Sequence, residues 1–279
     1  MTRVWDVLRS LFLWSVSWLH FLIVVPVLIA LAVVLDPRKH DWLQRGLCRR
    51  IAFFSGAKVV VQKAPGFDEK RTSIFMVNHV NLLDPFILYC GIPQLVRGWE
   101  LESHFRIPIY GWLMKRFGNV PVPNERSPKD LKRLWRLTRE AINSGVSLII
   151  FPEAKRTRTG HLNEFEDGGF RLAQQLGVPI VPASLVGSFQ HLRTEDWILR
   201  PTTITICLHD TIETKGMHKE DVPALKQRVK QTIAAPVEAW LKEIALGAGP
   251  GDTSDQRSAT IDQEEEARPG ETRDAKRGG

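Results

Sequence analysis

Two side chains separated by four residues, His79 and Asp84, are the strongest candidates for chemistry in the sequence. They follow the apolar run Ser73–Val77, which predicts a buried strand, and the ends of strands are where α/β sheets present reactive groups. A carboxylate folded back onto one ring nitrogen would fix the tautomer of the histidine, while the other nitrogen accepts a proton from a hydroxyl group. The spacing also admits a purely structural interpretation, in which Asp84 caps a helix that begins at Pro85 and His79 is a strand-end histidine.

A second candidate follows another apolar strand, Ser147–Phe151. Arginine binds phosphate through two parallel hydrogen bonds, and a neighbouring carboxylate can orient it. The loop that follows this strand, residues 152–160, therefore indicates a phosphate site, and a solvated basic loop is the alternative. Its charged residues are Glu153, Lys155, Arg156 and Arg158.

The sequence offers no pattern for a bound metal. The remaining histidines are scattered, no HExxH motif occurs, and Cys48, Cys90 and Cys207 form no CxxC pair. We therefore expect no metal and no disulfide framework, and we interpret the cysteines as reduced core residues. The helix expected over residues 129–144 carries five basic side chains, which suit coenzyme A phosphates, anionic lipid or simply solvent.

An apolar segment near the N-terminus, Leu11–Leu35, contains no Asp, Glu, Lys or Arg. As a helix it would be about 37 Å long, enough to cross a hydrocarbon core of about 30 Å. Pro26 would kink one helix or mark the tip of a hairpin, and a cleaved signal peptide or a buried core helix are further alternatives. Basic residues are denser after the segment than before it, which places the body on the cytoplasmic side of a membrane.

The elements that must position the candidate residues alternate between strands and helices. After the first strand, the pattern predicts a helix from Pro128 that is capped by Ser127 and has Leu131, Leu134 and Leu137 on one face. It also predicts a helix over 170–176, strands over 180–186 and 202–208, and a long helix over 223–245. This order indicates an α/β fold with a central mixed, mostly parallel sheet flanked by helices, and an N-terminal membrane helix or hairpin.

Three segments follow from these patterns and from composition. We expect a membrane anchor over 1–45, a catalytic domain over 46–246 and a disordered tail over 247–279, which has almost no apolar residues. The net charge of +7 suits an anionic partner, and the apolar segment makes a phospholipid surface the better match than nucleic acid.

Four motifs in order resemble those of the glycerolipid acyltransferases related to 1-acylglycerol-3-phosphate acyltransferase. They cover Ser73 to Gly187: Asn78-His79 with Asp84-Pro85, Gly118 to Arg126, Phe151-Pro152-Glu153 with Arg156, and Val181-Pro182-Ala183. The resemblance implies that His79 is the base and Asp84 orients it. It implies a site for the acceptor's phosphate at Arg126, Glu153 and Arg156, with Lys155 beside it. It also implies that Pro182 shapes the pocket floor near the acyl chain.

The resemblance implies an activity as well. A fatty acyl chain would move from acyl-CoA or acyl carrier protein to the free hydroxyl of 1-acylglycerol-3-phosphate, giving phosphatidate in phospholipid biosynthesis, with no bound cofactor. The chain departs from the family where Ala154-Lys155 replaces the usual Gly-Thr and where Pro123-Asn124-Glu125 precedes Arg126. These departures lie around the acceptor, so acylation of another lyso-lipid is the first alternative, and a catalytically silent lipid-binding protein is the second.

Overall fold

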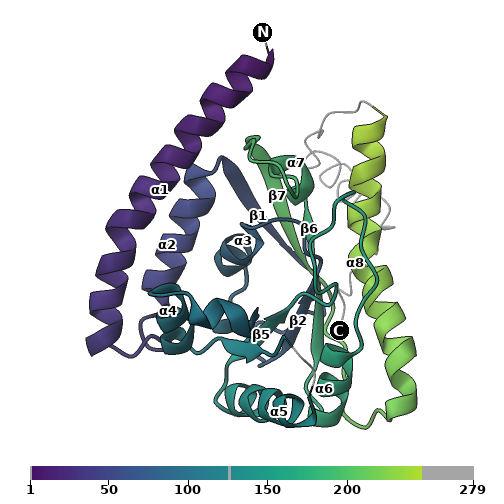
Figure 1. Ribbon diagram of the computed structural model, residues 1–279. Coiled ribbons are helices and arrows are strands. Elements are labelled where there is room, and N and C mark those ends of the chain that lie inside the picture. Colours follow the sequence, from purple (N-terminus) through teal and green to yellow (C-terminus); the bar gives the residue numbers. More distant parts are fainter. Residues whose placement is uncertain (1, 125–126, 247–279) are drawn as a thin grey trace, which may run out of the picture. The chain divides into compact units, whose positions relative to one another are not determined.

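A seven-stranded sheet forms the centre of the computed structural model, which describes residues 2–124 and 127–246. The strand order is β1-β7-β6-β2-β5-β3-β4, and every neighbouring pair is parallel except β6 and β7. The mixed, mostly parallel sheet predicted from the sequence is therefore confirmed (Figure 1). The strands are β1 (Ala57–Lys63), β2 (Ile74–Val77), β3 (Val96–Leu101), β4 (Val120–Val122), β5 (Ser147–Ile150), β6 (Ile180–Val186) and β7 (Thr202–Leu208).

Helices cover both faces of this sheet (Figure 1). One face carries α1 (Thr2–Val34), α2 (Asp41–Phe54), α3 (Asp84–Gly91) and α4 (Tyr110–Phe117). The other carries α5 (Pro128–Asn143), α6 (Gly168–Leu176) and, up to Glu238, α8 (Val222–Ala245). Short helices connect these elements: η1 (Glu102–Arg106), α7 (Ser188–His191) and η2 (Lys219–Asp221). Residues up to Glu238 form one compact unit; a second begins at Ala239, and its described part is the end of α8.

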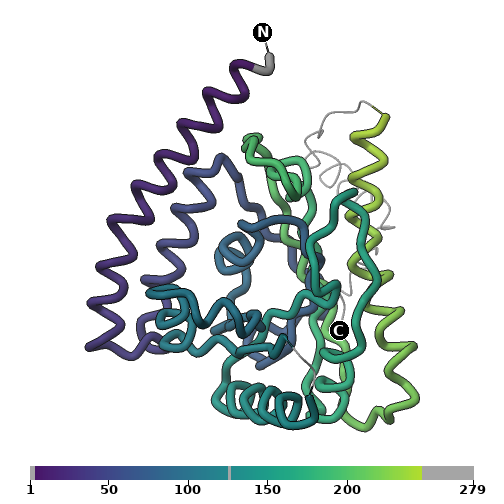
Figure 2. The backbone as a smooth tube through the Cα atoms, in the orientation of Figure 1, coloured from purple at the N-terminus to yellow at the C-terminus, as the bar shows by residue number. Residues whose placement is uncertain are grey.

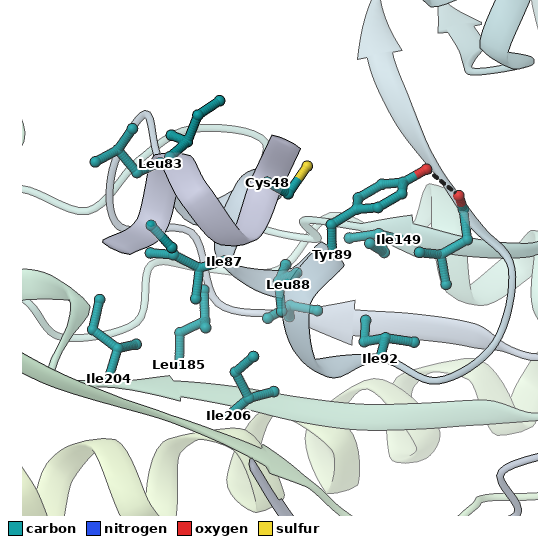
Figure 3. Close-up of a cluster of buried hydrophobic side chains, with 14 of the residues drawn as sticks. Cys48, Leu83, Ile87, Leu88, Tyr89, Ile92, Ile149, Leu185, Ile204 and Ile206 are labelled. Carbon is teal, nitrogen blue, oxygen red and sulfur yellow. Dashed lines mark hydrogen bonds between the residues drawn. The ribbon is translucent and has the colours of Figure 1, made fainter. Parts of the chain in front are cut away.

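Each face of the sheet has its own hydrophobic core, because side chains alternate along a strand. In β2, Phe75 and Val77 belong to the core beneath α2 and α3, while Ile74 and Met76 belong to the core beneath α5, α6 and α8. Figure 3 shows the first of these cores, in which the α3 side chains Ile87 and Leu88 lie against strands of the sheet. The two cores hold β2 rigidly from both sides, and β2 leads directly into the segment with His79.

The N-terminal apolar segment is a single helix, α1, which continues through Pro26. The structure therefore does not contain the hairpin considered as an alternative. Residues Val4–Val34 are long and apolar enough, by length and composition, to cross a membrane. Figure 2 shows α1 and α2 as neighbouring purple and blue helices on one side of the molecule.

One face of α1 packs against the rest of the chain, and the opposite face is exposed. Buried positions recur from Ser10 through Val25 to Ala32, and Ser10 hydrogen-bonds the backbone of Leu199. At the other end, the guanidinium of Arg116 in α4 donates to the carbonyl oxygens of Ala32 and Leu35, which the end of a helix leaves without partners. The exposed apolar side chains include Trp5, Leu8, Leu11, Phe12, Trp18, Leu19, Leu22, Ile23, Val27, Val33 and Val34.

Most elements predicted from the sequence are present within one or two residues of their expected ends. Ser127 caps α5 by accepting a hydrogen bond from the backbone N–H of Asp130, as predicted. The face predicted for α5 is wrong at one position, since Leu131 is exposed and the buried face instead runs through Leu134 and Thr138. The buried hydroxyl of Thr138 accepts a hydrogen bond from the indole of Trp99 at 3.2 Å.

Candidate active site

His79 and Asp84 come together as the sequence predicted, in the segment between the end of β2 and the start of α3. The ring nitrogen Nδ1 of His79 lies 2.9 Å from Oδ2 of Asp84. Asp84 is fully buried, whereas 20% of the His79 side chain is exposed. The ring of His79 stacks on Phe151, with centroids 4.0 Å apart and an interplanar angle of 18°. The stacking fixes the plane of the ring, and the exposed part leaves it open to a substrate.

Both oxygens of Asp84 have hydrogen-bond donors besides the histidine. Oδ2 accepts from the backbone N–H groups of Val80 at 2.6 Å and Asn81 at 2.9 Å, and Oδ1 accepts from the hydroxyl of Ser188 at 2.7 Å. The capping role considered for Asp84 is wrong: it is the first residue of α3, Leu83 is the N-cap, and the carboxylate bonds backbone that precedes the helix. The loop wraps around the carboxylate, which thereby holds the orientation of His79.

Two asparagines attach the loop over residues 78–83, the candidate catalytic loop, to β6 and to the helix that follows it. The side chain of Asn78 both donates to the carbonyl of Leu185, at 3.1 Å, and accepts from its N–H, at 2.7 Å. The amide of Asn81 donates to the carbonyl and to the hydroxyl of Ser188, at 3.0 and 2.8 Å. The loop is therefore fixed to a neighbouring strand rather than free in solvent.

Glu153 is part of the same arrangement. One of its oxygens accepts the backbone N–H of His79 at 2.8 Å, and the other accepts that of Asn163 at 2.7 Å. Only 3% of Glu153 is exposed, and burial raises the pKa of this carboxyl while the two backbone hydrogen bonds oppose the rise. Its carboxylate thus joins the loop after β5 to the loop after β2.

Thr194, in the segment between α7 and β7, connects the same two loops. Its hydroxyl lies 2.8 Å from the carbonyl oxygen of Val80 and 2.5 Å from that of Thr157, and its single proton is shared between them. The N–H of Thr157 donates to the carbonyl of His79 at 2.9 Å. The loop over residues 78–83 and the basic loop after β5, over residues 152–160, are therefore connected to each other.

The basic side chains of the second candidate site project from the basic loop. Ala154 has φ 58°, in the left-handed region, where glycine is far better tolerated. Lys155 and Arg156 are exposed, and the structure describes no ion pair for either, whereas Arg158 pairs with Glu195 at 2.6 Å. Lys155 and Arg156 are thus available to an anion beside His79.

The other predicted site residues lie elsewhere. Pro182 is buried in the middle of β6, opposite Met76 of β2, and its carbonyl accepts the N–H of His209 at 3.0 Å. Arg126 lies outside the described residues. Among the residues that the structure describes, no group of three or more His, Cys, Asp or Glu side chains is arranged to hold a metal.

Sequence reasoning missed Ser188, Asn163 and Thr194 as supporting residues. Ser188 carries a signal that could have revealed it, because it follows the end of an apolar strand just as His79 does. Asn163 holds Glu153 through its backbone N–H, which any residue could supply, and Thr194 lies in an irregular segment, so neither has a recognisable pattern.

This geometry permits general-base chemistry at one atom. Since Nδ1 of His79 faces the carboxylate, Nε2 is the nitrogen left to accept a proton from a substrate hydroxyl. The residues have the relations found in a catalytic dyad: a base, a buried carboxylate that orients it, and a nearby basic loop that can bind an anion.

Comparisons with known proteins show that the chain is similar to acyltransferases. Residues 58–186 match the model of the acyltransferase family. A chloroplastic 1-acyl-sn-glycerol-3-phosphate acyltransferase of Brassica napus is 29% identical over 140 residues, which is 50% of this chain and 40% of the relative. A 1-acyl-sn-glycerol-3-phosphate acyltransferase of Cocos nucifera is 27% identical over 150 residues, 54% of this chain and 49% of the relative. This chain therefore covers about half or less of the length of these two relatives.

A human relative is covered more completely. The 1-acyl-sn-glycerol-3-phosphate acyltransferase beta of Homo sapiens is 28% identical over 207 residues, 73% of this chain and 74% of the relative. Among solved structures, that of the 1-acyl-sn-glycerophosphate acyltransferase PlsC from Thermotoga maritima has a similar fold, with a TM-score of 0.70 at 20% identity, over 86% of this chain and 97% of that one. The resemblance seen in the motifs is thereby confirmed: residues 58–186 match the acyltransferase family model, and the similar proteins carry the name of 1-acyl-sn-glycerol-3-phosphate acyltransferases.

Proposed function

We propose that this chain is a membrane-bound O-acyltransferase that esterifies the free hydroxyl of 1-acylglycerol-3-phosphate, giving phosphatidate in phospholipid biosynthesis. The observation that supports it best is the His79–Asp84 pair, buried on the aspartate side and open on the histidine side. Relatives that carry the name 1-acyl-sn-glycerol-3-phosphate acyltransferase support the choice of acceptor.

The proposed reaction uses His79 as its only proton carrier. Nε2 takes the proton of the acceptor hydroxyl as its oxygen attacks the carbonyl carbon of a thioester, either acyl-CoA or acyl carrier protein. The tetrahedral intermediate then collapses, the carbon–sulfur bond breaks, and the imidazolium returns the proton to the leaving thiolate. Asp84 stabilises the imidazolium between the two steps. A nucleophilic serine or cysteine is unnecessary, because the thioester is already activated.

The acceptor's phosphate is proposed to lie against Lys155 and Arg156, whose side chains are exposed beside the catalytic loop. Arg126, from the second motif, completes this site in the proposal. Glu153 is proposed to act indirectly, because its oxygens already accept backbone N–H groups and hold His79. Pro182 is proposed to shape the pocket floor from within β6.

We propose that α1 attaches the chain to a membrane, with the catalytic part on the cytoplasmic side. Contacts on one face from Ser10 to Ala32 join α1 to the catalytic part over most of its length. A helix held in this way is better suited to lie within one leaflet, with its exposed apolar face toward the lipid, than to cross the bilayer. The predicted anchor at 1–45 is kept in this proposal, together with a catalytic domain at 46–246.

An acceptor and donor panel tests the proposed substrate. Purified, detergent-solubilised protein is supplied with labelled acyl-CoA or acyl carrier protein and with lysophosphatidate, other lysophospholipids or uncharged monoacylglycerol. Lysophosphatidate is expected to be the preferred acceptor. If it is inert while another lyso-lipid is acylated, that lipid is the substrate, and binding without any turnover identifies a lipid-binding protein instead.

The phosphate site has its own test. Lys155→Ala and Arg156→Ala are expected to raise KM for lysophosphatidate by about tenfold each, since a charge-assisted hydrogen bond contributes about 1.5–3 kcal/mol. The same variants should not change KM for monoacylglycerol, which has no phosphate. Arg228→Ala, at an exposed position of α8, is the matched control. Equal effects on both acceptors would contradict a phosphate site at this loop.

A further inference from the structure

Four large apolar side chains are exposed on the segment that leads from β3 through η1 into α4. The exposed fractions are 47% for Leu101, 49% for Ile107, 63% for Ile109 and 40% for Trp112. We call these four residues the apolar rim. Single exposed apolar residues are common on soluble proteins, but a cluster of four on one short segment is typical of a contact surface.

The backbone holds part of this rim in a conformation that is costly by itself. Ile109 has φ 67° and ψ −59°, and the N–H of Tyr110 donates to the carbonyl of Pro108 at 2.7 Å, closing a three-residue turn. A β-branched residue at positive φ is strongly disfavoured. The turn is also rigidly supported, because a Cβ at Gly111 would lie 2.1 Å from the carbonyl oxygen of Phe105. The side chain of Ile109 is mostly exposed, so packing inside the protein does not offset the cost of this conformation. We therefore infer that the conformation serves a contact outside the chain.

The segment that carries the rim is linked to α1 at one end and to the central sheet at the other. Its helix, α4, covers the same face of the sheet as α1 (Figure 1), and Arg116, one turn after Trp112, bonds the last carbonyl oxygens of α1. At its other end, Leu101 is the last residue of β3, which is parallel to β5, and β5 is parallel to β2. The carboxyl ends of these strands share one edge, so the rim begins, at Leu101, on the edge of the sheet that carries His79.

Basic side chains accompany the apolar ones. Of the two acids in the segment, Glu102 forms an ion pair with Arg133, and Glu100 hydrogen-bonds the ring of His104. Arg106 and Lys115 are exposed, and the described residues provide no ion pair for either. Apolar side chains flanked by exposed basic ones match the acyl chains and phosphates of an anionic bilayer.

We propose that the apolar rim is a second membrane-contact surface, separate from α1, which inserts into an anionic bilayer and places the His79 site at the level of the lipid headgroups. The insertion itself is independent of the proposed reaction. Its kinetic consequence, that the acceptor reaches His79 directly from the bilayer, rests on the proposed function.

A fluorescent label tests the insertion without any activity measurement. Burial raises the pKa of Cys90 and Cys207 to about 11, so these native thiols should react slowly with a maleimide or iodoacetamide at neutral pH. Ile109→Cys is labelled with the environment-sensitive dye NBD, and Ser144→Cys, exposed just before the amino end of β5, is the matched control. Each protein is mixed with vesicles of phosphatidylglycerol and phosphatidylethanolamine, with or without doxyl-labelled lipid.

The expected result is a blue-shifted, severalfold brighter NBD signal at position 109 that doxyl lipid quenches, and a water-like signal at position 144. Vesicles of phosphatidylcholine alone should give a weaker response at position 109. A water-like signal at position 109, while the protein floats with the vesicles, would overturn the proposal. Equal responses in neutral and anionic vesicles would overturn its electrostatic part.

Kinetics then test the consequence. Ile109→Gly removes the side chain and relieves the turn, so the fold should be retained or slightly stabilised. KM for an acceptor presented in vesicles should rise about tenfold, because burial of one apolar side chain in the bilayer contributes about 1.5 kcal/mol or more. KM for a short-chain, water-soluble acceptor should stay at the wild-type value. Equal KM values for both presentations would refute the consequence. A wild-type chain that is inactive on every acceptor would refute the proposed function, and the NBD signal would still decide the insertion.

Discussion

Ser188 supports Asp84, the proposed partner of His79, and removing its hydroxyl should separate an effect on positioning from an effect on folding. Its hydroxyl is the only donor described for Oδ1 of Asp84, at 2.7 Å, and both residues have no exposed surface. A hydrogen bond to a charged group contributes about 1.5–3 kcal/mol, and removing a donor leaves a buried carboxylate oxygen without a partner. Ser188→Ala should therefore lower the free energy of unfolding by about 2 kcal/mol.

The same substitution should reduce kcat more than it changes KM. With Oδ1 unpartnered, the carboxylate can rotate away from Nδ1 of His79, and each 1.36 kcal/mol of lost transition-state stabilisation is a factor of about ten in rate. We expect kcat to fall roughly tenfold. Ser188→Thr, which keeps the hydroxyl, should recover most of it.

Ser184, on β6, provides the control because it is also fully buried. Its hydroxyl donates to the carbonyl of Ile233 at 3.0 Å and bonds neither His79 nor Asp84. Ser184→Ala should cost stability and preserve kcat. Stability is measured by thermal unfolding and kcat by single-substrate kinetics with saturating donor. The reasoning is refuted if both alanine variants lose the same stability and Ser188→Ala keeps the wild-type kcat.

Two further predictions concern stability. Ala154→Gly should stabilise the fold by about 0.5–1 kcal/mol, because relief of the left-handed conformation at φ 58° exceeds the added flexibility of the unfolded chain. Ala224→Gly, in the exposed first turns of α8, is the control and should instead destabilise the fold. A lower melting temperature for Ala154→Gly would contradict the strain inferred at this residue. Burial lowers the pKa of His191 below its ordinary value of 6.5, so the unfolded chain binds its proton first as the pH falls. Stability should therefore decline as the pH falls below about 6.5. His191→Gln should flatten part of that decline in unfolding midpoints measured between about pH 5 and 7, and a further part is expected from His209, whose pKa burial also lowers.

The sequence was sufficient for the parts of the fold that depend on local pattern. Apolar runs predicted β2, β5 and β6, and capping residues predicted the start of α5, because these signals act within a few residues. The pairing of the strands was harder to predict from the sequence. The edge positions of β1 and β4, and the antiparallel pairing of β6 with β7, depend on contacts between residues far apart in the chain.

The candidate site divides in the same way. The His79–Asp84 pair was predictable because a single loop holds both residues. The task of Glu153 was not, because its two partners are the backbone N–H groups of His79 and Asn163, which carry no sequence signal. The strain at Ala154 could be suspected only from the glycine usual in the family, and the structure supplies its physical reason in the positive φ.

The central claim is that His79 is the base that activates the acceptor hydroxyl. It is tested most directly by the rate of acyl transfer from labelled acyl-CoA to lysophosphatidate in His79→Ala, with His161→Ala, an exposed histidine paired with Glu238, as the control. Loss of a positioned general base should lower the rate of the His79 variant by about 10²–10⁴-fold, while the control keeps its activity. A His79→Ala protein that folds and transfers acyl groups at the wild-type rate would contradict the account.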